Sequence, residues 1–376
     1  MNQTSKGAYI MSPSQVMSMI TSTTIGVGVL TLPRTVTQSA HQAGWISVLV
    51  GGLLSMAVLW TIVKVGQKYP HATRIHSGSN TLLANMLAMP SAITFVLFWI
   101  LTTAGTARTF GEVVVTAVLV KTPLEVIVWS MLIAGFILVM YDIEVMVRVH
   151  ETLLPILVIP LLVIAILAFQ SAEFIRLMPL FSFDWKGLFI GVMASSFAYQ
   201  GYEHAGLYLE HINFRHKESR RAAILGLVYP MMTYVLIVIA GIASFGYEEL
   251  QRLMWPTLEL VKTTEVPGLI LERLESAFLG VWVAAVFTTV GSGFFSSCYA
   301  LKKLMNIRSH RYIAIGLLPV LYFLAMWPDN VHQLFQYLKW VALLGMILNL
   351  LTPVILWVLG MVQQERAVSQ QGDGQP

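Results

Sequence analysis

The sequence contains little charge. Charged residues occupy 11% of its 376 positions, whereas a soluble domain carries about 25%. Hydrophobic residues make up 56% of the chain, so too few polar groups remain to cover a water-facing surface. This composition excludes soluble, fibrous and disordered proteins. It predicts a protein that keeps most of its outer surface in the lipid bilayer.

Cysteine is almost absent, and the common catalytic motifs are missing. The single cysteine, Cys298, allows no internal disulfide and no cysteine-based metal site. No phosphate-binding loop, HExxH pair or GxSxG turn occurs, and the histidines lack metal-ligand spacing. The basic run at 211–221 is too short and too close to an apolar segment for nucleic acid. We therefore expect no enzyme activity, no metal, no cofactor and no nucleic-acid partner.

Long apolar runs dominate the chain. A membrane-spanning helix needs about 20 apolar residues, and continuous runs favour helices over the alternating strands of a barrel. Ten such runs occur, at Ser12–Leu32, Gly44–Val65, Ala92–Val118, Val126–Met140, Leu153–Phe169, Leu188–Leu209, Ala223–Phe245, Phe278–Leu301, Tyr312–Trp327 and Leu334–Leu359. The sequence thus predicts an all-α polytopic membrane protein with ten transmembrane helices. Residues 1–376 form a single transmembrane domain that ends in a polar C-terminal tail at 363–376.

The distribution of lysine and arginine predicts the orientation in the membrane. Cytoplasmic loops carry an excess of these residues. If the N-terminus is cytoplasmic, the basic loops after the sixth and eighth spans, at 215–221 and 302–311, also lie inside. We therefore expect both termini on the cytoplasmic side. The longest outer loop, 246–275, has apolar residues near helical spacing, which favours a helix on the membrane surface.

Ten spans divide into two halves of five, 1–170 and 171–362. An odd number of spans per half inverts the second half relative to the first, as in many secondary transporters. The first span of each half is the most interrupted: one contains Gly26 and Gly28, the other contains Gly201. Glycine costs a helix about 1 kcal/mol relative to alanine. We expect both helices to be unwound at mid-membrane, although glycines that serve only close helix packing are the alternative.

Two broken helices that meet would form a binding site. Half-helix N-termini expose N–H groups suited to a carboxylate, and freed carbonyls suit an ammonium group. A zwitterionic amino acid satisfies both. Hydroxyl-bearing residues on the third and eighth spans could complete the pocket, or could only satisfy the backbone of their own helices. The candidate ligand-binding residues are Ile25, Gly26, Val27, Gly28, Thr102, Thr106, Ala198, Tyr199, Gln200, Gly201, Thr288 and Ser292.

Three charged residues inside the spans are candidates for a charge network. Arg108 and Glu112 lie four residues apart on the third span and can pair on one helix face. A structural ion pair is the alternative. Glu203 follows the break in the sixth span, where its carboxylate could cap freed N–H groups or contact a ligand ammonium.

Three motifs carry a resemblance to a known family. They are TTIGVGVLTLP at 23–33, FAYQGYEH at 197–204, and WPTLELV with VPGLILERLE within 255–275. With the span count, they resemble the amino acid–polyamine–organocation transporter superfamily. Within it, the chain most resembles the B subunits of bacterial spore germinant receptors. This resemblance implies the five-plus-five inverted fold known as LeuT-type, with Gly26, Gly28 and 198–201 at the two breaks.

The resemblance also implies a function. Such B subunits are nutrient sensors in the spore inner membrane that act with an A subunit and a lipoprotein C subunit. The germinant would be a small molecule such as an amino acid. An ion-coupled amino acid transporter is the alternative. The apolar run Leu153–Phe169 lacks the lysine that some proton-coupled relatives carry in the fifth span, which favours sensing over pumping.

Overall fold

The computed structural model describes residues 9–68, 82–179, 184–263 and 274–372. Within these ranges every regular element is a helix. The longer helices are α3 (Gly44–Lys68), α4 (Leu82–Ala117), α5 (Leu124–Val139), α6 (Ile143–Leu167), α9 (Lys217–Phe245), α12 (Leu274–Leu304), α13 (His310–Met326) and α14 (Val331–Gly372). The shorter ones are α1 (Pro13–Thr24), α2 (Gly28–Ala40), η1 (His41–Ala43), η2 (Ala168–Ser171), η3 (Phe174–Leu177), α7 (Trp185–Tyr199), α8 (His204–Leu207), η4 (Leu209–His211), α10 (Tyr247–Arg252) and α11 (Pro256–Lys262).

The long helices are apolar enough to cross a bilayer. Six helical stretches of the described chain reach the required length and hydropathy, and α5 and α13 are shorter apolar helices. The six are Gly28–Lys68, Met89–Ala117, Ile143–Gln170, Lys217–Phe245, Glu275–Leu304 and Val331–Ile355. With the interrupted pairs α1–α2 and α7–α8, the arrangement is compatible with the ten predicted spans. Helix α14 extends to Gly372, so the predicted polar tail continues this helix.

The first predicted span is divided into α1 and α2. A capping box at Ser12 and Gln15 starts α1, which satisfies its first N–H groups. The helix stops after Thr24, and Ile25 adopts an extended conformation with φ −79° and ψ 103°. Helix α2 then begins at Gly28 without a side-chain cap. The backbone is therefore non-helical over Ile25–Val27.

The sixth predicted span is interrupted in the same way. The side chain of Asp184 caps α7 by accepting hydrogen bonds from the N–H groups of Lys186 and Gly187. Helix α7 ends at Tyr199, and Gln200 is extended. Gly201 has φ +129°, a backbone angle that residues with a side chain rarely adopt. Helix α8 then begins at His204. A glycine at this position makes the sharp change of direction possible.

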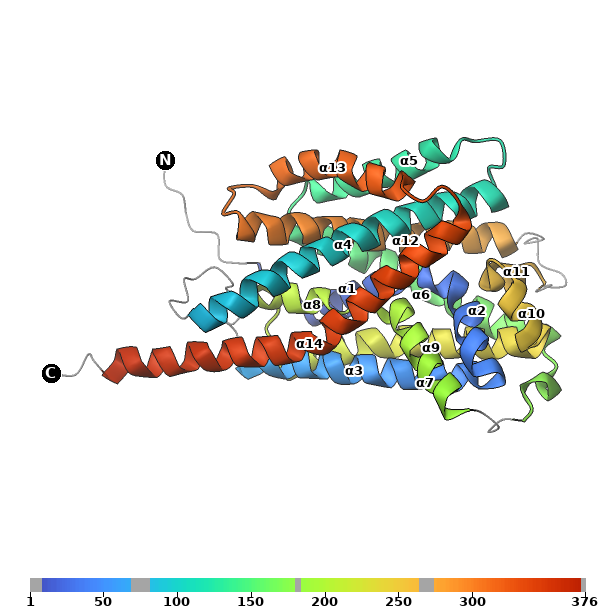
Figure 1. Ribbon diagram of the computed structural model, residues 1–376, viewed down its shortest axis with the longest axis horizontal. Helices are drawn as coiled ribbons and strands as arrows, with labels where there is room; N and C mark the ends of the chain where they lie inside the picture. Colours follow the sequence, from blue (N-terminus) through green and yellow to red (C-terminus); the bar gives the residue numbers. More distant parts are fainter. Residues whose placement is uncertain (1–8, 69–81, 180–183, 264–273, 373–376) are drawn as a thin grey trace.

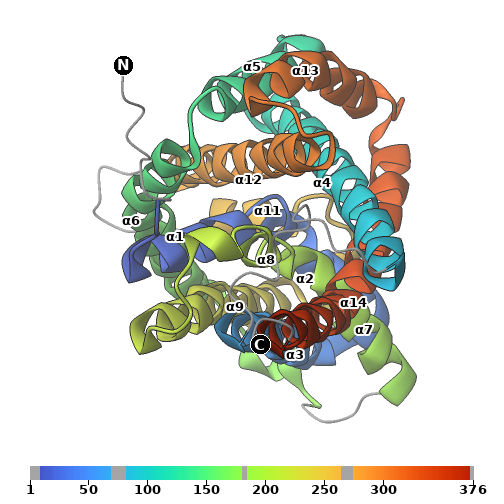
Figure 2. The same ribbon diagram turned by 90° about the vertical axis from the view of Figure 1, so that its left-hand side faces the viewer.

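The broken helices occupy the middle of the bundle. Figure 2 shows α1 and α8 near the centre, surrounded by α12, α4, α14, α3, α9 and α6. Helix α2 packs against α7, and α1 packs against α9, α6 and α12. Large side chains such as Tyr199, Tyr208 and Trp282 are fully buried in this core. Apolar side chains on the outside, for example Trp60 and Phe323, are exposed, as a lipid-facing surface requires.

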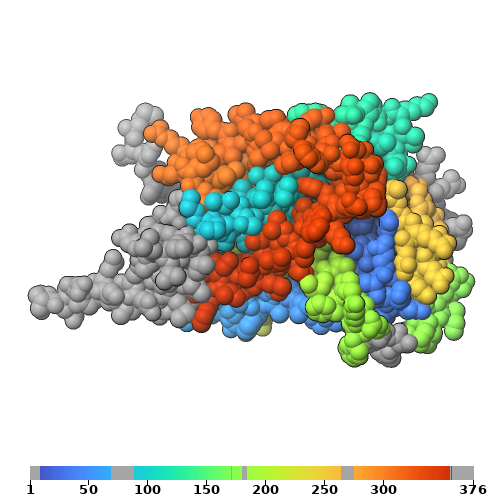
Figure 3. Space-filling model, viewed as in Figure 1, coloured from blue at the N-terminus to red at the C-terminus, as the bar shows by residue number. Residues whose placement is uncertain are grey.

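The remaining helices close the sides and one end of the molecule. Helix α14 crosses the face shown in Figure 3 and packs against α4, α3 and α7. Helices α10 and α11 lie at the end opposite the projecting part of α14 (Figure 1). Their apolar residues Leu250, Leu258 and Val261 are buried, and Thr257 Oγ1 donates to Val29 O at 2.6 Å. The predicted loop is therefore helical at 247–252 and 256–262, and the apolar side of these helices packs on the protein; 264–273 lie outside the described residues.

Candidate functional site

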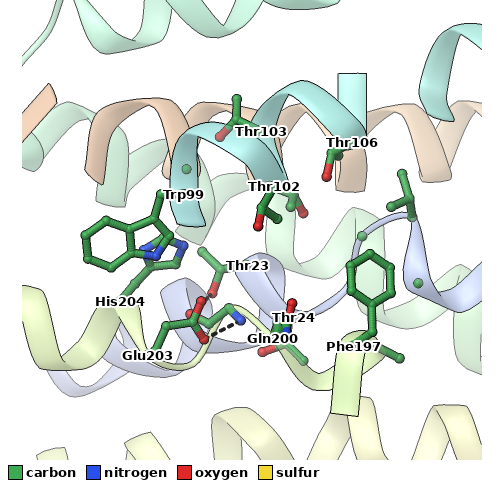
Figure 4. Close-up of a pocket in the computed structure, with 17 residues that line it drawn as sticks. Thr23, Thr24, Trp99, Thr102, Thr103, Thr106, Phe197, Gln200, Glu203 and His204 are labelled. Atoms are coloured by element: carbon green, nitrogen blue, oxygen red, sulfur yellow. Dashed lines mark hydrogen bonds between the residues drawn. The ribbon is translucent and has the colours of Figure 1, made fainter. Parts of the chain in front are cut away.

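A small cavity lies where the two breaks meet. Helices α4 and α12 complete its walls, and its volume is about 40 Å³. One water molecule needs roughly 10–15 Å³ on this measure, so the cavity has room for about three waters. The lining residues are Thr23, Thr24, Gly26, Val27, Gly28, Trp99, Thr102, Thr103, Thr106, Phe197, Ala198, Gln200, Gly201, Glu203, His204, Thr289 and Gly293. Figure 4 shows Thr102 and Thr106 of α4 facing Thr24 and Gln200 across this space.

Glycines allow the two breaks to approach each other closely. A Cβ atom on Gly28 would lie 2.8 Å from the Cα of Ala198, which is backbone and cannot rotate away. A Cβ atom on Gly201 would overlap the backbone of Thr23. The glycine-rich breaks thus have a packing role as well as a conformational one, and both interpretations of the sequence apply.

Side chains satisfy several of the backbone groups freed by the breaks. Thr288 Oγ1 lies 3.1 Å from Ser22 O and Thr289 Oγ1 lies 3.3 Å from Ile25 O, and each hydroxyl of α12 shares its proton with the nearer Ala285 O. Tyr234 OH donates to Thr24 O at 2.9 Å. Such partners are needed because water cannot satisfy the backbone inside a bilayer. The carbonyls at the end of α1 are consequently occupied by hydroxyl donors.

Glu203 holds the second break in place. Its carboxylate accepts a hydrogen bond from Gly201 N at 2.7 Å, drawn as a dashed line in Figure 4. The Gly201 carbonyl lies 3.2 Å from Thr23 Oγ1, which shares its proton between this carbonyl and the nearer Met19 O, and the contact joins the two breaks. Of the two roles predicted for Glu203, the structure contains the capping of a freed N–H group. The carboxylate also lines the cavity.

Three buried polar atoms of the lining have no hydrogen-bond partner within the described chain. They are Thr102 Oγ1, Thr103 Oγ1 and Gln200 Oε1, whereas the indole N–H of Trp99 interacts with the Glu203 carboxylate. The other end of the Gln200 amide is fixed, since Nε2 donates to Ala342 O at 3.1 Å. A buried polar atom without a partner is costly. Two hydroxyls and one amide acceptor can therefore bind a ligand in this cavity.

Eight of the predicted ligand-binding residues line the cavity. They are Gly26, Val27, Gly28, Thr102, Thr106, Ala198, Gln200 and Gly201. Their predicted neighbourhood is correct, whereas their part in ligand binding remains a prediction. All of them follow from the glycine breaks or from the threonines one turn apart on α4.

Four other candidates lie outside the lining, because their side chains contact other parts of the protein. Ile25 is fully buried in the apolar core. Tyr199 OH donates to Val48 O at 2.9 Å on α3. Thr288 binds the α1 backbone, and Ser292 Oγ lies 2.9 Å from His150 Nε2. The structure thus places these four candidates outside the lining, and their part in ligand binding stays a prediction.

The predicted Arg108–Glu112 pair forms, but it lies away from the cavity. The two side chains are 2.8 Å apart and almost fully buried. Arg108 also points at the sulfur of Met326 on α13. Neither residue lines the cavity. The pair therefore joins α4 to α13, as the structural alternative supposed.

Sequence analysis missed other lining residues. Thr23 and Thr24 directly precede the first break, and Phe197 and His204 flank the second. Trp99 lies one turn before Thr102 and Thr103 on α4, with its ring stacked on that of His204 at 5.4 Å between centroids. Helical spacing from Thr102 would have indicated Trp99. Thr289 and Gly293 complete the lining from α12.

A second polar cluster lies near the C-terminal end of α12. Lys303 Nζ donates to the Glu210 carboxylate at 2.7 Å, and Tyr299 OH donates to the same carboxylate. His211 Nε2 lies 2.9 Å from Tyr299 OH. Burial alone would raise the pKa of Glu210, but the bonds from Lys303 and Tyr299 hold it below its ordinary value. The cluster ties η4 to α12.

Curated proteins of similar sequence are spore germination proteins. YndE of Bacillus subtilis is 28% identical over 336 residues, which cover 89% of this chain and 92% of that protein. Spore germination protein A2 of the same organism is 26% identical, with coverage of 92% and 94%. GerLB of Bacillus cereus is 24% identical, with coverage of 90% and 91%.

Solved structures establish the fold. The nucleobase-cation-symport-1 family transporter Mhp1, closed with bromovinylhydantoin bound, matches with a TM-score of 0.60 and 14% identity over 90% of this chain and 77% of that chain. A Na⁺-coupled sialic acid symporter in a substrate-bound outward-open state matches with a TM-score of 0.66 and 14% identity over 93% and 78%. The all-α LeuT-type fold predicted from the sequence is confirmed.

The family is defined by a match over most of the chain. The model described as spore germination protein covers residues 10–334. These relatives and fold neighbours are germination proteins and transporters rather than enzymes. The chain belongs to the spore germination protein family.

Proposed function

We propose that this chain is the nutrient-binding subunit of a spore germinant receptor. It binds a small amino acid in the cavity between the two broken helices, and binding shifts the subunit to a conformation that triggers germination. The observation that carries this proposal is the uncapped N-terminus of α2, which lies beside three buried polar atoms without partners in the described chain.

The carboxylate of the ligand would bind at α2. This helix has thirteen residues and starts at Gly28 without a side-chain cap, and Gly28 and the two residues before it line the cavity. Helix N-termini attract anions through free N–H groups and the positive end of the helix dipole. The carboxylate would approach these N–H groups from the cavity, since the Cβ side of Gly28 is filled by Ala198.

The ammonium group would bind on the opposite side of the cavity. Gln200 Oε1 is an acceptor without a partner, and the Thr102 hydroxyl can accept as well. The Glu203 carboxylate supplies a negative charge while it holds Gly201. Bonds to a charged group contribute about 1.5–3 kcal/mol each. An amino acid thus finds complementary groups for both of its charged ends.

The size of the cavity restricts the ligand. A volume of about 40 Å³ suits only compact molecules, with glycine and alanine as the best-fitting amino acids. Leucine or an aromatic amino acid would require the broken helices to separate. We therefore select L-alanine as the probe.

The proposal also includes a location in the membrane and partner subunits. The apolar helices and the germination relatives indicate an integral membrane protein. We infer that it lies in the spore inner membrane, with both termini on the cytoplasmic core side, and acts with A-type and C-type receptor subunits. Full-length similarity to spore germination proteins A2 and B2 supports this inference.

Binding of radiolabelled L-alanine to the purified chain tests the proposal. We expect saturable binding that glycine displaces and leucine does not. Gly26→Leu should abolish binding, because a Cβ atom there already lies 2.8 Å from Thr289 Oγ1. Gly280→Leu is the matched control, since Gly280 lies on α12 with no atom within 4 Å of its Cβ position. Equal binding by both variants would contradict the proposed site.

An ion-coupled amino acid transporter is the second candidate function. One of the two fold neighbours is a transporter and the other is a Na⁺-coupled symporter. Reconstituted vesicles distinguish the two functions. Accumulation of labelled L-alanine against a gradient would establish transport. Loss of the spore's response to L-alanine in spores that carry Gly26→Leu, with normal uptake in growing cells, would establish sensing.

A further inference from the structure

A buried histidine lies behind the cavity and has no part in the proposed ligand site. His150 belongs to α6, which begins at Ile143, so the fifth span starts before the predicted Leu153 and does contain a basic group. The side chain is 0% exposed. Its Nδ1 bonds with Ser22 Oγ on α1, and its Nε2 lies 2.9 Å from Ser292 Oγ on α12. One imidazole therefore connects three helices.

The hydrogen bonds around His150 specify its neutral form. Ser22 Oγ donates its single proton to Ser18 O at 2.6 Å, so it can only accept from the imidazole. Nδ1 therefore carries the hydrogen. Nε2 is then an acceptor, and the Ser292 hydroxyl donates to it. A second proton could be added only at Nε2, where Ser292 would have to turn its hydroxyl from donating to accepting.

Within the described part of the chain, no carboxylate contacts the His150 imidazole. Helix α1 has no ionisable residue, and the α12 group that contacts His150 is the hydroxyl of Ser292. The nearby titratable group of α8 is His204, whose own charge would oppose a second one. On the packed helices α5 and α9, Glu125 lies in the first turn of α5, and Tyr229 and Tyr234 bind backbone carbonyls.

The charged groups on α6 itself are engaged elsewhere. Arg148 pairs with Glu144, and Glu151 accepts a hydrogen bond from Ser14 at 2.5 Å. Burial without a partner disfavours the charged form of a side chain strongly. Protonation of His150 is therefore incompatible with the packing of α1 against α6 and α12 that the structure shows.

We propose that His150 is a proton-binding site whose occupancy opposes the docking of α1 on α6 and α12. Ser22, which bonds to the imidazole, is followed by Thr23, which lines the cavity. Thr288 holds the Ser22 carbonyl from the same side. A proton on Nε2 makes Ser292 an acceptor and places an unneutralised charge against these contacts, so the end of α1 loosens. Deprotonation restores the docked arrangement.

Hydrogen exchange tests the proton site without any ligand. The amides of 13–24 are followed by mass spectrometry from about pH 4 to about pH 8 and corrected for intrinsic exchange. We expect protection to fall at least tenfold toward low pH in the wild type, and to stay level in His150→Gln. His310→Gln is the matched control, because His310 is also buried but bonds to backbone carbonyls of Val139 and Tyr141. It should keep the wild-type transition.

Two results of the exchange measurement would overturn the inference. A pH transition that survives in His150→Gln overturns the inference, as does the absence of any transition in the wild type. The second of these results needs no variant, so a poorly folded His150→Gln leaves the test intact. His150→Asn provides a second neutral replacement.

Ligand binding extends the test and rests on the proposed function. If L-alanine binds the docked arrangement, it must expel the proton, so its affinity should fall tenfold per pH unit once His150 is protonated. His150→Gln should bind with a pH-independent affinity over the same range. Failure of L-alanine to bind the wild type at any pH would count against the proposed function alone, because the exchange measurement stands without ligand.

Discussion

Gly201 offers the sharpest test of how the two broken helices fit together. Its φ of +129° lies in a region that favours glycine, and a Cβ atom would overlap the Thr23 backbone. Gly201→Ala therefore introduces two separate penalties. Other glycines of the chain show each penalty alone, so the expected loss of stability can be divided into its parts.

The magnitudes follow from this comparison. Gly246 has φ +78° with no atom within 4 Å of its Cβ position, so Gly246→Ala should cost only the backbone strain, about 1–3 kcal/mol. Gly28→Ala adds a Cβ atom 2.8 Å from Ala198 Cα at an ordinary φ, and overpacking costs about 1–3 kcal/mol. Gly201→Ala should cost about 2–6 kcal/mol, the sum of both effects. Gly280→Ala has neither penalty and should be neutral or stabilise by up to about 1 kcal/mol.

Reversible unfolding of the purified variants by sodium dodecyl sulfate in mixed micelles measures these differences. L-alanine binding to the folded variants, measured without sodium dodecyl sulfate, gives the second readout. Of these four variants, only Gly28→Ala and Gly201→Ala change the cavity wall. If Gly201→Ala is no less stable than Gly280→Ala, the two breaks do not touch as the structure shows. If Gly246→Ala matches Gly201→Ala, strain alone explains the effect and the contact with Thr23 contributes nothing.

Three further substitutions have outcomes that the structure specifies. Glu112→Ala leaves Arg108 buried without its partner and should cost about 3–5 kcal/mol of unfolding free energy, with no change in L-alanine affinity because the pair faces α13. Gln200→Leu removes the amide oxygen proposed to bind the ammonium group and should weaken L-alanine binding at least tenfold, as an equilibrium binding assay would show. Glu210 has a depressed pKa in the folded state, so it contributes stability above its unfolded value of 4.5 that is lost as the pH falls through its folded pKa. Glu210→Gln should thus be less stable than the wild type at neutral pH, and acid titration of both proteins should show the difference shrinking below about pH 4.5.

The broken helices could be predicted because glycine acts locally. Gly26, Gly28 and Gly201 weaken a helix wherever it lies, and the odd number of spans in each half places the two breaks at equivalent positions. The threonines of α4 were found for a related reason. Thr102 and Thr106 are one turn apart, so a shared face follows from helix geometry alone.

The orientation of each side chain depends on tertiary packing, which the sequence does not reveal. Thr288 and Thr289 are adjacent hydroxyls on α12, yet only Thr289 lines the cavity, because a rotation of about 100° separates consecutive side chains. The predicted start of the fifth span, Leu153, is incorrect for another reason. Glu144, Arg148 and Glu151 lower the hydropathy of the first turns of α6, so an apolar window excludes His150 although the helix begins at Ile143.

The contacts that hold the end of α1 have the right total strength for a ligand-operated switch. Four hydrogen bonds link the end of α1 and Ile25 to other segments: Thr23 to Gly201 O, Tyr234 to Thr24 O, Thr288 to Ser22 O and Thr289 to Ile25 O. The three threonine hydroxyls share their proton with a nearer carbonyl of their own helix. At about 0.5–1.5 kcal/mol for a full bond, the four contribute at most roughly 2–6 kcal/mol together. A shift from 1:99 to 99:1 requires a differential affinity of about 5.5 kcal/mol. A ligand bound by two charge-assisted contacts supplies about 3–6 kcal/mol, so it can decide between the docked and released positions of α1, as the proposed sensing function requires.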